Sequence, residues 1–307
     1  MRASSLMLML LAAGCDGGEE TKDTDEGGTT DTSDTSGTED RGFDHFVNTT
    51  STYTGDISCS GTTPATPDPS CQVDHALTGV VEDFQDGGGV PDATIKFWFG
   101  DDISTTADLS VTGDDDGNFT AEVPSCTPLG YGTSTPYGDT VDTFEVHQVY
   151  DYEASHTLDE TVNSVSAGTA AIIPSIIGVT WDETSTGIIA GTAFDCNEDP
   201  IGHAQVFLHD GSGNAPATGE VFYFDDSDFP ADNQSVPDAN PNNGLWVAIN
   251  VPVGTWVAEM WGWNGTEYEN LGATELEIKV GSVNISNIYA GRTDGIYYPA
   301  SCLSTCE

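Results

Sequence analysis

Short runs in which apolar and polar residues alternate recur through the chain after residue 70, and glycine, aspartate, asparagine and proline separate them. In ATIKFWF, residues 93–99, Ile95 and Phe97 share one face of an extended strand, and Lys96 and Trp98 share the other. Similar runs include GNFTAEVP, AQVFLHD, LWVAINVP and TWVAEMWGW. A period of two residues is typical of β-strands with one buried face. We therefore predict an all-β protein.

One segment departs from this pattern. SAGTAAIIPSIIG, residues 166–178, is a weak helical candidate, and Pro174 is expected to stop or kink any helix there. We interpret residues 166–185 as a buried connector between two domains.

The chain also contains an internal repeat. LTGVVEDFQDGGGVPDATIKFWF, residues 77–99, aligns with IAGTAFDCNEDPIGHAQVFLHD, residues 189–210, and GDDDGNFTAEVP, residues 113–124, matches DANPNNGLWVAINVP, residues 238–252. The alignment equates Gly79 with Gly191, Asp83 with Asp195, Val90 with Ile201, Ala93 with Ala204 and Ile95 with Val206. Because a repeated unit of this length is the size of one sandwich, we predict two tandem prealbumin-like or Ig-like β-sandwich domains, residues 45–165 and 186–307.

The two copies share a sequence motif. It consists of a strand with Gly-x-Val, an Asp-containing turn, a second strand, a glycine turn, an aromatic strand and a closing Val-Pro. It resembles the carboxypeptidase regulatory-like domain, over residues 77–124 and 189–290. This resemblance implies a prealbumin-like sandwich that is not itself catalytic. Modules of the collagen-adhesin B type are the alternative, and they imply a lysine–asparagine cross-link beside a buried acid, for which Lys96 and Lys279 are available.

The N-terminus has the layout of a secretory signal: Arg2, an apolar run over residues 6–13, and small residues before Cys15. The apolar run is shorter than the ~20 residues that span a bilayer. LAAGC, residues 11–15, resembles the bacterial lipobox, although its leucine stands four residues before the cysteine instead of three. The resemblance implies that residues 1–14 are removed and that Cys15 carries the lipid. The alternative is an ordinary signal peptide.

Residues 15–44 consist almost entirely of Asp, Glu, Thr, Ser and Gly, so we predict a disordered acidic tether. We expect an exported protein that is lipid-anchored in the cell envelope, with the outer membrane or cell surface preferred. The inner membrane is the rival location, because Asp16 after the lipidated cysteine resembles a retention signal.

The charge of the chain is strongly one-sided. It has 51 acidic residues against 6 lysines and arginines, and its formal net charge is −45. Nucleic acid is excluded as a partner, because contacts with phosphates need cations that this chain lacks. The acidity indicates either a solvated surface or weak sites for calcium.

Six cysteines follow Cys15, and an even number in an exported chain predicts up to three disulfides. The shortest loops close most easily, and the pairing expected on that ground is Cys59 with Cys71, Cys302 with Cys306 and Cys126 with Cys196. Other pairings stay open, because sequence alone does not determine connectivity.

Two groups of residues are weak candidates for a site. Asp114, Asp116 and Asn118 gather oxygens in GDDDGN as a calcium loop would, but the same residues suit a tight turn with Gly117 at positive φ, which we favour. Trp261 and Trp263 share one face in MWGWNG. Such a pair could stack on a sugar or anchor a protein, but core packing is the commoner role and is the one that we favour.

No nucleophile motif and no zinc-ligand spacing occurs in the sequence, so enzyme activity is unsupported and no catalytic residue or cofactor is assigned. We predict a lipid-anchored envelope protein with non-catalytic binding or scaffolding modules. It would contact the membrane through its lipid and a protein or carbohydrate through its modules. The alternatives are a calcium-stabilised surface adhesin and an accessory subunit of a secreted enzyme.

Overall fold

The computed structural model describes residues 51–63, 65–85, 87–231, 236 and 238–306. The expected signal segment, Cys15 and the acidic tether lie outside this range. Among the described residues, none of the helices is long and apolar enough to cross a membrane.

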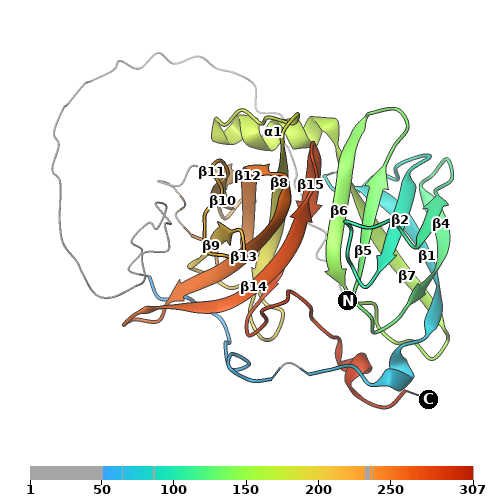
Figure 1. Ribbon diagram of the computed structural model, residues 1–307, viewed down its shortest axis with the longest axis horizontal. Helices are drawn as coiled ribbons and strands as arrows, with labels where there is room; N and C mark the ends of the chain where they lie inside the picture. The colour runs from blue at the N-terminus through green and yellow to red at the C-terminus, as the bar shows by residue number, and fades with distance from the viewer. Residues whose placement is uncertain (1–50, 64, 86, 232–235, 237, 307) are drawn as a thin grey trace.

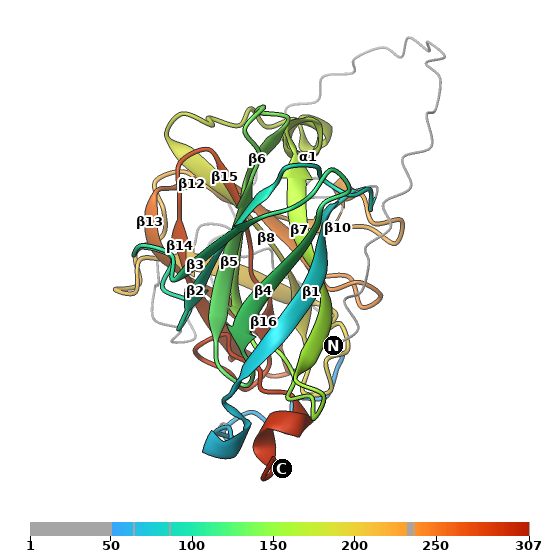
Figure 2. The same ribbon diagram turned by 90° about the vertical axis from the view of Figure 1, so that its right-hand side faces the viewer.

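The first half of the chain forms two sheets, which confirms the all-β prediction (Figures 1 and 2). One sheet has the order β4-β1-β7 and the other the order β3-β2-β5-β6. Leu77, Ile95 and Phe97 are fully buried in the core of this half. The strands are β1 (Asp74–Asp83), β2 (Thr94–Phe99), β3 (Leu109–Thr112), β4 (Asn118–Pro124), β5 (Leu129–Ser134), β6 (Thr140–Gln148) and β7 (Thr157–Ser166).

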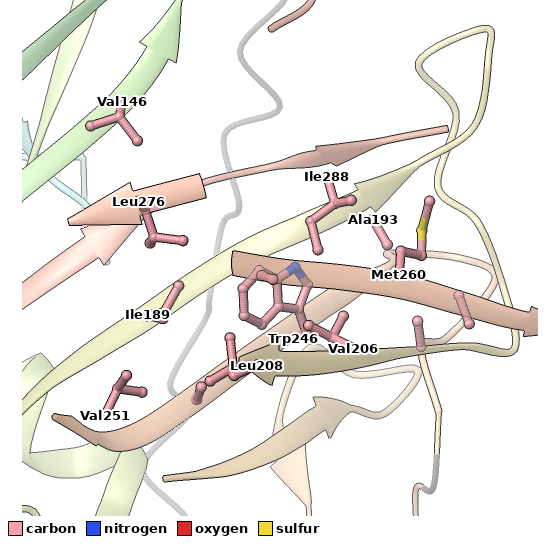
Figure 3. Packing of buried hydrophobic residues seen from close by; sticks show 14 of the residues in the cluster. Val146, Ile189, Ala193, Val206, Leu208, Trp246, Val251, Met260, Leu276 and Ile288 are labelled. Carbon is pink, nitrogen blue, oxygen red and sulfur yellow. The ribbon is translucent and has the colours of Figure 1, made fainter. Parts of the chain in front are cut away.

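The second half also forms two sheets, with the orders β11-β10-β12-β8-β15 and β14-β13-β9. Trp246, which is fully buried, lies in the cluster of apolar residues around Ile189, Val206 and Met260 (Figure 3). The strands are β8 (Thr186–Phe194), β9 (Ala204–His209), β10 (Glu220–Phe224), β11 (Pro230–Ala231), β12 (Leu245–Pro252), β13 (Gly254–Trp263), β14 (Tyr268–Ile278), β15 (Ser282–Ile285) and β16 (Ile288–Tyr289). Short 3-10 helices η1 (Pro69–Cys71) and η2 (Ala300–Leu303) lie near the two ends of the described chain.

Strand pairing confirms the internal repeat. The first strand of each copy pairs antiparallel with the Val-Pro strand in the same register: His75 pairs with Val123, and Gly187 pairs with Val251. A parallel strand flanks each first strand on its other side, β7 beside β1 and β15 beside β8. The equivalent hydrogen bonds from the amide of Val90 and from that of Ile201 reach their own first strands at 2.8 and 2.9 Å. The pairing around the first strand therefore occurs twice, whereas the third strand differs, because β3 pairs with β2 and β10 pairs with β12.

The two halves are joined by backbone pairing and by a shared core. β15 of the second half pairs in parallel with β6 of the first. Trp98, Ile103 and Val146, all from the first half, belong to the same buried cluster as the core of the second. Trp98 shares its strand face with exposed Lys96, yet it is 5% exposed because the second half covers it. The domain boundaries given above stay a prediction.

The segment after β7 forms the helix α1 (Ala167–Ile177), so of the two effects expected of Pro174, a stop or a kink, the stop is wrong and the kink stays a prediction. The Ser166 side chain caps the first turn by accepting from the Thr169 amide at 3.1 Å. Pro174 lies in the last turns, where its missing N–H removes one hydrogen bond, and the helix continues to Gly178 in the left-handed conformation (φ 83°). Ala170 of α1 is buried in the cluster that covers the outer face of β12, which is why LWVAINVP is an apolar run.

All six cysteines pair, as predicted, but the expected pairing is wrong. The disulfides join Cys59 to Cys196, Cys71 to Cys306 and Cys126 to Cys302. The short loops Cys59–Cys71 and Cys302–Cys306 do not form, because each terminal segment crosses to the other half along one end of the molecule (Figure 1). The segment before η1 lies on the second half, where the Tyr53 amide donates to the Trp263 carbonyl at 3.0 Å. The segment after β16 lies on the first half.

Candidate functional site

The residues GDDDGN form the turn between β3 and β4. One carboxylate oxygen of Asp114 accepts hydrogen bonds from the Asp116 and Asn118 amides at 2.9 and 2.8 Å, and these bonds lower the pKa of Asp114. Gly117 has a φ of 82°, as the turn requires. Within the described ranges, no group of three or more His, Cys, Asp and Glu is placed to hold a metal ion. The geometry agrees with the turn interpretation.

Trp261 and Trp263 lie on the outward face of the β14-β13-β9 sheet. Alternate residues of β13, Ala258, Met260 and Gly262, are buried on the inward face, whereas both tryptophans are half-buried. Neither tryptophan belongs to the buried clusters that form the core. The preference for core packing is therefore not supported, and ligand binding stays a prediction.

The contacts of the two tryptophans place flat rings beside a carboxylate. The Trp263 ring lies 5.1 Å from that of Tyr268, at an interplanar angle of 56°. The Trp261 indole N–H donates to Glu259 Oε2 at 2.8 Å, and the other oxygen of Glu259 lies 3.5 Å from His209 Nε2. Rings of this kind can stack on the apolar face of a sugar while a carboxylate accepts from its hydroxyls.

A second feature, which the sequence does not indicate, is an acidic cleft of about 440 Å³ between the halves. Its lining includes apolar Ile103, Val146 and Leu276, and the carboxylates lie around them. The lining residues that carry acid groups are Asp101, Asp102, Glu275, Glu277 and Asp294. They come from a loop of the first half, from β14 and from the C-terminal segment, so no local motif brings them together.

His147 lies in this cleft and bridges the two halves. Its Nδ1 is 2.7 Å from Asp101 Oδ2 and its Nε2 is 2.5 Å from the Glu275 carbonyl. Both partners are acceptors, so the doubly protonated ring satisfies both. Burial lowers the pKa of His147, but the hydrogen bond and charge of Asp101 outweigh burial, and the pKa lies above its ordinary value.

The first half also buries an ionisable pair. The Tyr131 hydroxyl and the Asn163 amide both donate to Glu145 Oε2, the latter at 3.0 Å. Desolvation raises the pKa of Glu145. The collagen-adhesin B cross-link would need a buried lysine beside such an acid, whereas Lys96 is exposed and Lys279 is half-buried 3.5 Å from Glu277.

No family model and no curated protein matches the chain. Among solved structures, it is similar to the shaft pilin SpaA from Lactobacillus rhamnosus GG, with 11% identity, 73% of this chain and 100% of that chain covered, and a TM-score of 0.23. The minor pilin of Streptococcus agalactiae is 10% identical over 73% of this chain and 98% of its own, with a TM-score of 0.21.

The TIE protein of Bacillus anthracis is 13% identical over 71% of this chain, with a TM-score of 0.23, and the chain spans about a third of its length, 34%. Likenesses at this level do not extend to function. The assignment of a β-sandwich fold rests on the strand topology of the chain itself.

Proposed function

We propose that this protein is an exported, lipid-anchored component of the cell envelope whose two carboxypeptidase regulatory-like halves form a non-catalytic binding module. The observation that carries the proposal is the set of three disulfides, each of which ties a terminal segment to the opposite half. Such bonds persist in oxidising compartments outside the cytosol. They hold the two halves as one scaffold that presents a constant surface.

The ligand face in this proposal is the aromatic surface made by Trp261, Trp263 and Tyr268. Half-buried rings beside the Glu259 carboxylate suit a carbohydrate, because a sugar has both an apolar face and hydroxyls that donate hydrogen bonds. The formal charge of −45 makes an acidic glycan a poor partner. A neutral polysaccharide of the envelope is therefore the ligand that we favour.

Lipid anchorage is tested with the full chain and its Cys15→Ser variant. The wild-type protein should partition with membranes and take up a labelled fatty acid, whereas the variant should do neither. Separation of inner from outer membrane then decides between the two locations. Incorporation of label into the variant would contradict attachment at residue 15.

Ligand binding is tested with Trp263→Ala against Trp256→Ala, a matched control on the same strand. Trp256 points to the inward face, where it contacts the core cluster. Its loss should cost about 3 kcal/mol of unfolding free energy. Trp263→Ala should cost about 1 kcal/mol and abolish binding on an array of neutral glycans. Binding that survives this change contradicts the proposed face, and capture of a protein in place of a glycan would change the ligand class.

The alternative of a calcium-stabilised adhesin gains no support from the geometry, because the Asp114 carboxylate is occupied within its own turn. Thermal unfolding in calcium and in chelator tests it, and an unchanged midpoint would dispose of it. No feature of the described residues specifically favours the other alternative, an accessory subunit of a secreted enzyme.

A further inference from the structure

Each disulfide connects a point near one end of the chain to a point far along it. Cys59 precedes β1 and bonds Cys196, which follows β8. Cys71 in η1 bonds Cys306, which follows η2 and is the last described residue. Cys126 follows β4 and bonds Cys302 in η2.

These bonds shorten the covalent route through the molecule. From Cys59 to Cys306 the backbone runs through 247 residues, but the route through the Cys71–Cys306 bond includes only the 12 residues from Cys59 to Cys71. From Cys59 to the second half the route is the Cys59–Cys196 bond alone. Both routes leave out strands β1 to β7.

We propose that the disulfides make this protein a load-bearing link, which carries tension from the N-terminal tether to the second half through Cys59–Cys196, and to the C-terminal end through Cys71–Cys306, without loading the first half. The inference rests on the proposed anchorage, because tension arises when an anchored chain holds a ligand. A tether that pulls on residue 59 pulls directly on residue 196, so the sandwich of the first half stays folded under load.

Non-covalent contacts hold the same end of the molecule together. The Asp68 amide donates to the Cys302 carbonyl at 2.8 Å, and the Cys306 amide donates to Ser70 Oγ at 2.9 Å. Cys71, Cys126 and Cys302 are fully buried in one cluster with Val149. The Cys126–Cys302 bond is therefore shielded from reductant in the folded protein, whereas Cys59, Cys196 and Cys306 are half-buried.

The connectivity predicts how far the chain can be drawn out. Twelve residues extend to at most about 40 Å, whereas 247 residues extend to about 840 Å, at ~3.4 Å per residue. Removal of the Cys71–Cys306 bond diverts the route through Cys126 and Cys302. It then includes the 55 residues from 71 to 126 and the four from 302 to 306, so the extension rises by about 200 Å.

The experiment is single-molecule stretching of the full chain carrying Cys15→Ser, with handles at its two ends, so that lipid and ligand play no part. Tether residues add the same length in every sample. The chain with intact disulfides should show no unfolding step longer than about 40 Å, and the reduced chain should approach full extension. The Cys71→Ala/Cys306→Ala pair should gain about 200 Å, with rupture of the first half.

The matched control is Cys126→Ala/Cys302→Ala, which leaves the 12-residue route in place and should extend no further than the wild type. Mass mapping of the native disulfides is the second measurement and does not depend on how a variant folds. Steps of several hundred ångströms in unreduced protein, or a Cys59–Cys71 pair in the map, would overturn the inference. Loss of lipid attachment alone would remove the anchor and leave these lengths unchanged.

Discussion

Gly191 of β8 is the position where one added methyl group should do most damage. An alanine Cβ there would lie 1.9 Å from the Ser286 carbonyl oxygen and 3.2 Å from the Trp246 indole nitrogen. Because non-bonded heavy atoms pack at about 3.5 Å or more, the Ser286 backbone would have to move by about 1.6 Å. The hydrogen bond from the Ser286 amide to the Ala190 carbonyl, 2.9 Å long, would then break.

The expected cost of Gly191→Ala combines that broken bond with overpacking against buried Trp246. A buried backbone pair left unsatisfied costs about 1–3 kcal/mol, and overpacking costs a similar amount, so we expect a loss of about 3 kcal/mol. At about 2–4 °C per kcal/mol, the melting temperature should fall by roughly 6–12 °C. Guanidinium unfolding and differential scanning calorimetry under non-reducing conditions measure both quantities.

Gly168→Ala is the control for this experiment. Gly168 is an exposed residue in α1, and the nearest atom to an added Cβ is Ser166 Oγ at 3.8 Å. Alanine should stabilise the helix by about 0.5–1 kcal/mol. Surface substitutions usually change the free energy of unfolding by less than about 0.5 kcal/mol. If Gly191→Ala changes it by no more than that, the close approach of the two strands would be refuted.

Three further predictions concern the disulfide cluster and two titrating groups. With the other two disulfides intact, the Cys126–Cys302 bond closes a loop of 59 residues, so its replacement by two alanines should lower the unfolding free energy by about 4 kcal/mol in denaturant titrations. Burial raises the pKa of Glu145 above 4.5, so the folded state holds the proton more tightly than the unfolded state does. The free energy of unfolding should therefore fall as pH rises from 4.5 through the folded pKa, by about 1.4 kcal/mol for each unit by which the two pKa values differ. Glu145→Gln should remove this pH dependence. The pKa of His147 should lie above 6.5 in an NMR titration and should drop in Asp101→Asn, because the remaining effect of burial lowers it.

Each of these has an outcome that contradicts it. An unfolding free energy unchanged by loss of the Cys126–Cys302 bond would mean that the cluster is held by packing alone. Parallel pH profiles for the wild type and Glu145→Gln would place the slope on another group. A pKa of His147 that does not respond to Asp101→Asn would show that the 2.7 Å contact is not maintained in solution.

Much of the strand structure was predictable, because alternation is a local property of the backbone. Ala93 and Ala204, equated in the repeat, are both fully buried at the start of equivalent strands. Gly79 and Gly191 are both glycine for the same reason, since a Cβ would meet the carbonyl of a parallel neighbour at 2.4 and 1.9 Å. The turn at Asp114 followed from residue types within a few positions of each other.

The candidate sites were predictable only in part. That Trp261 and Trp263 share a face follows from their spacing, but only the sheet shows that this face points away from the core. The acidic cleft was not predictable at all, because Asp101, His147 and Glu275 are far apart in the sequence and each has ordinary neighbours.

The sequence by itself determined the class of fold, its duplication and the number of disulfides, because strand period, turn residues and cysteine parity act over short distances. Tertiary structure alone decided which cysteines meet, why Trp98 is buried on a face it shares with exposed Lys96, and where the halves form a cleft. These features depend on the packing of the two halves and on the exchange of terminal segments between them. That exchange brings together residues more than a hundred positions apart, and no local pattern records such a contact.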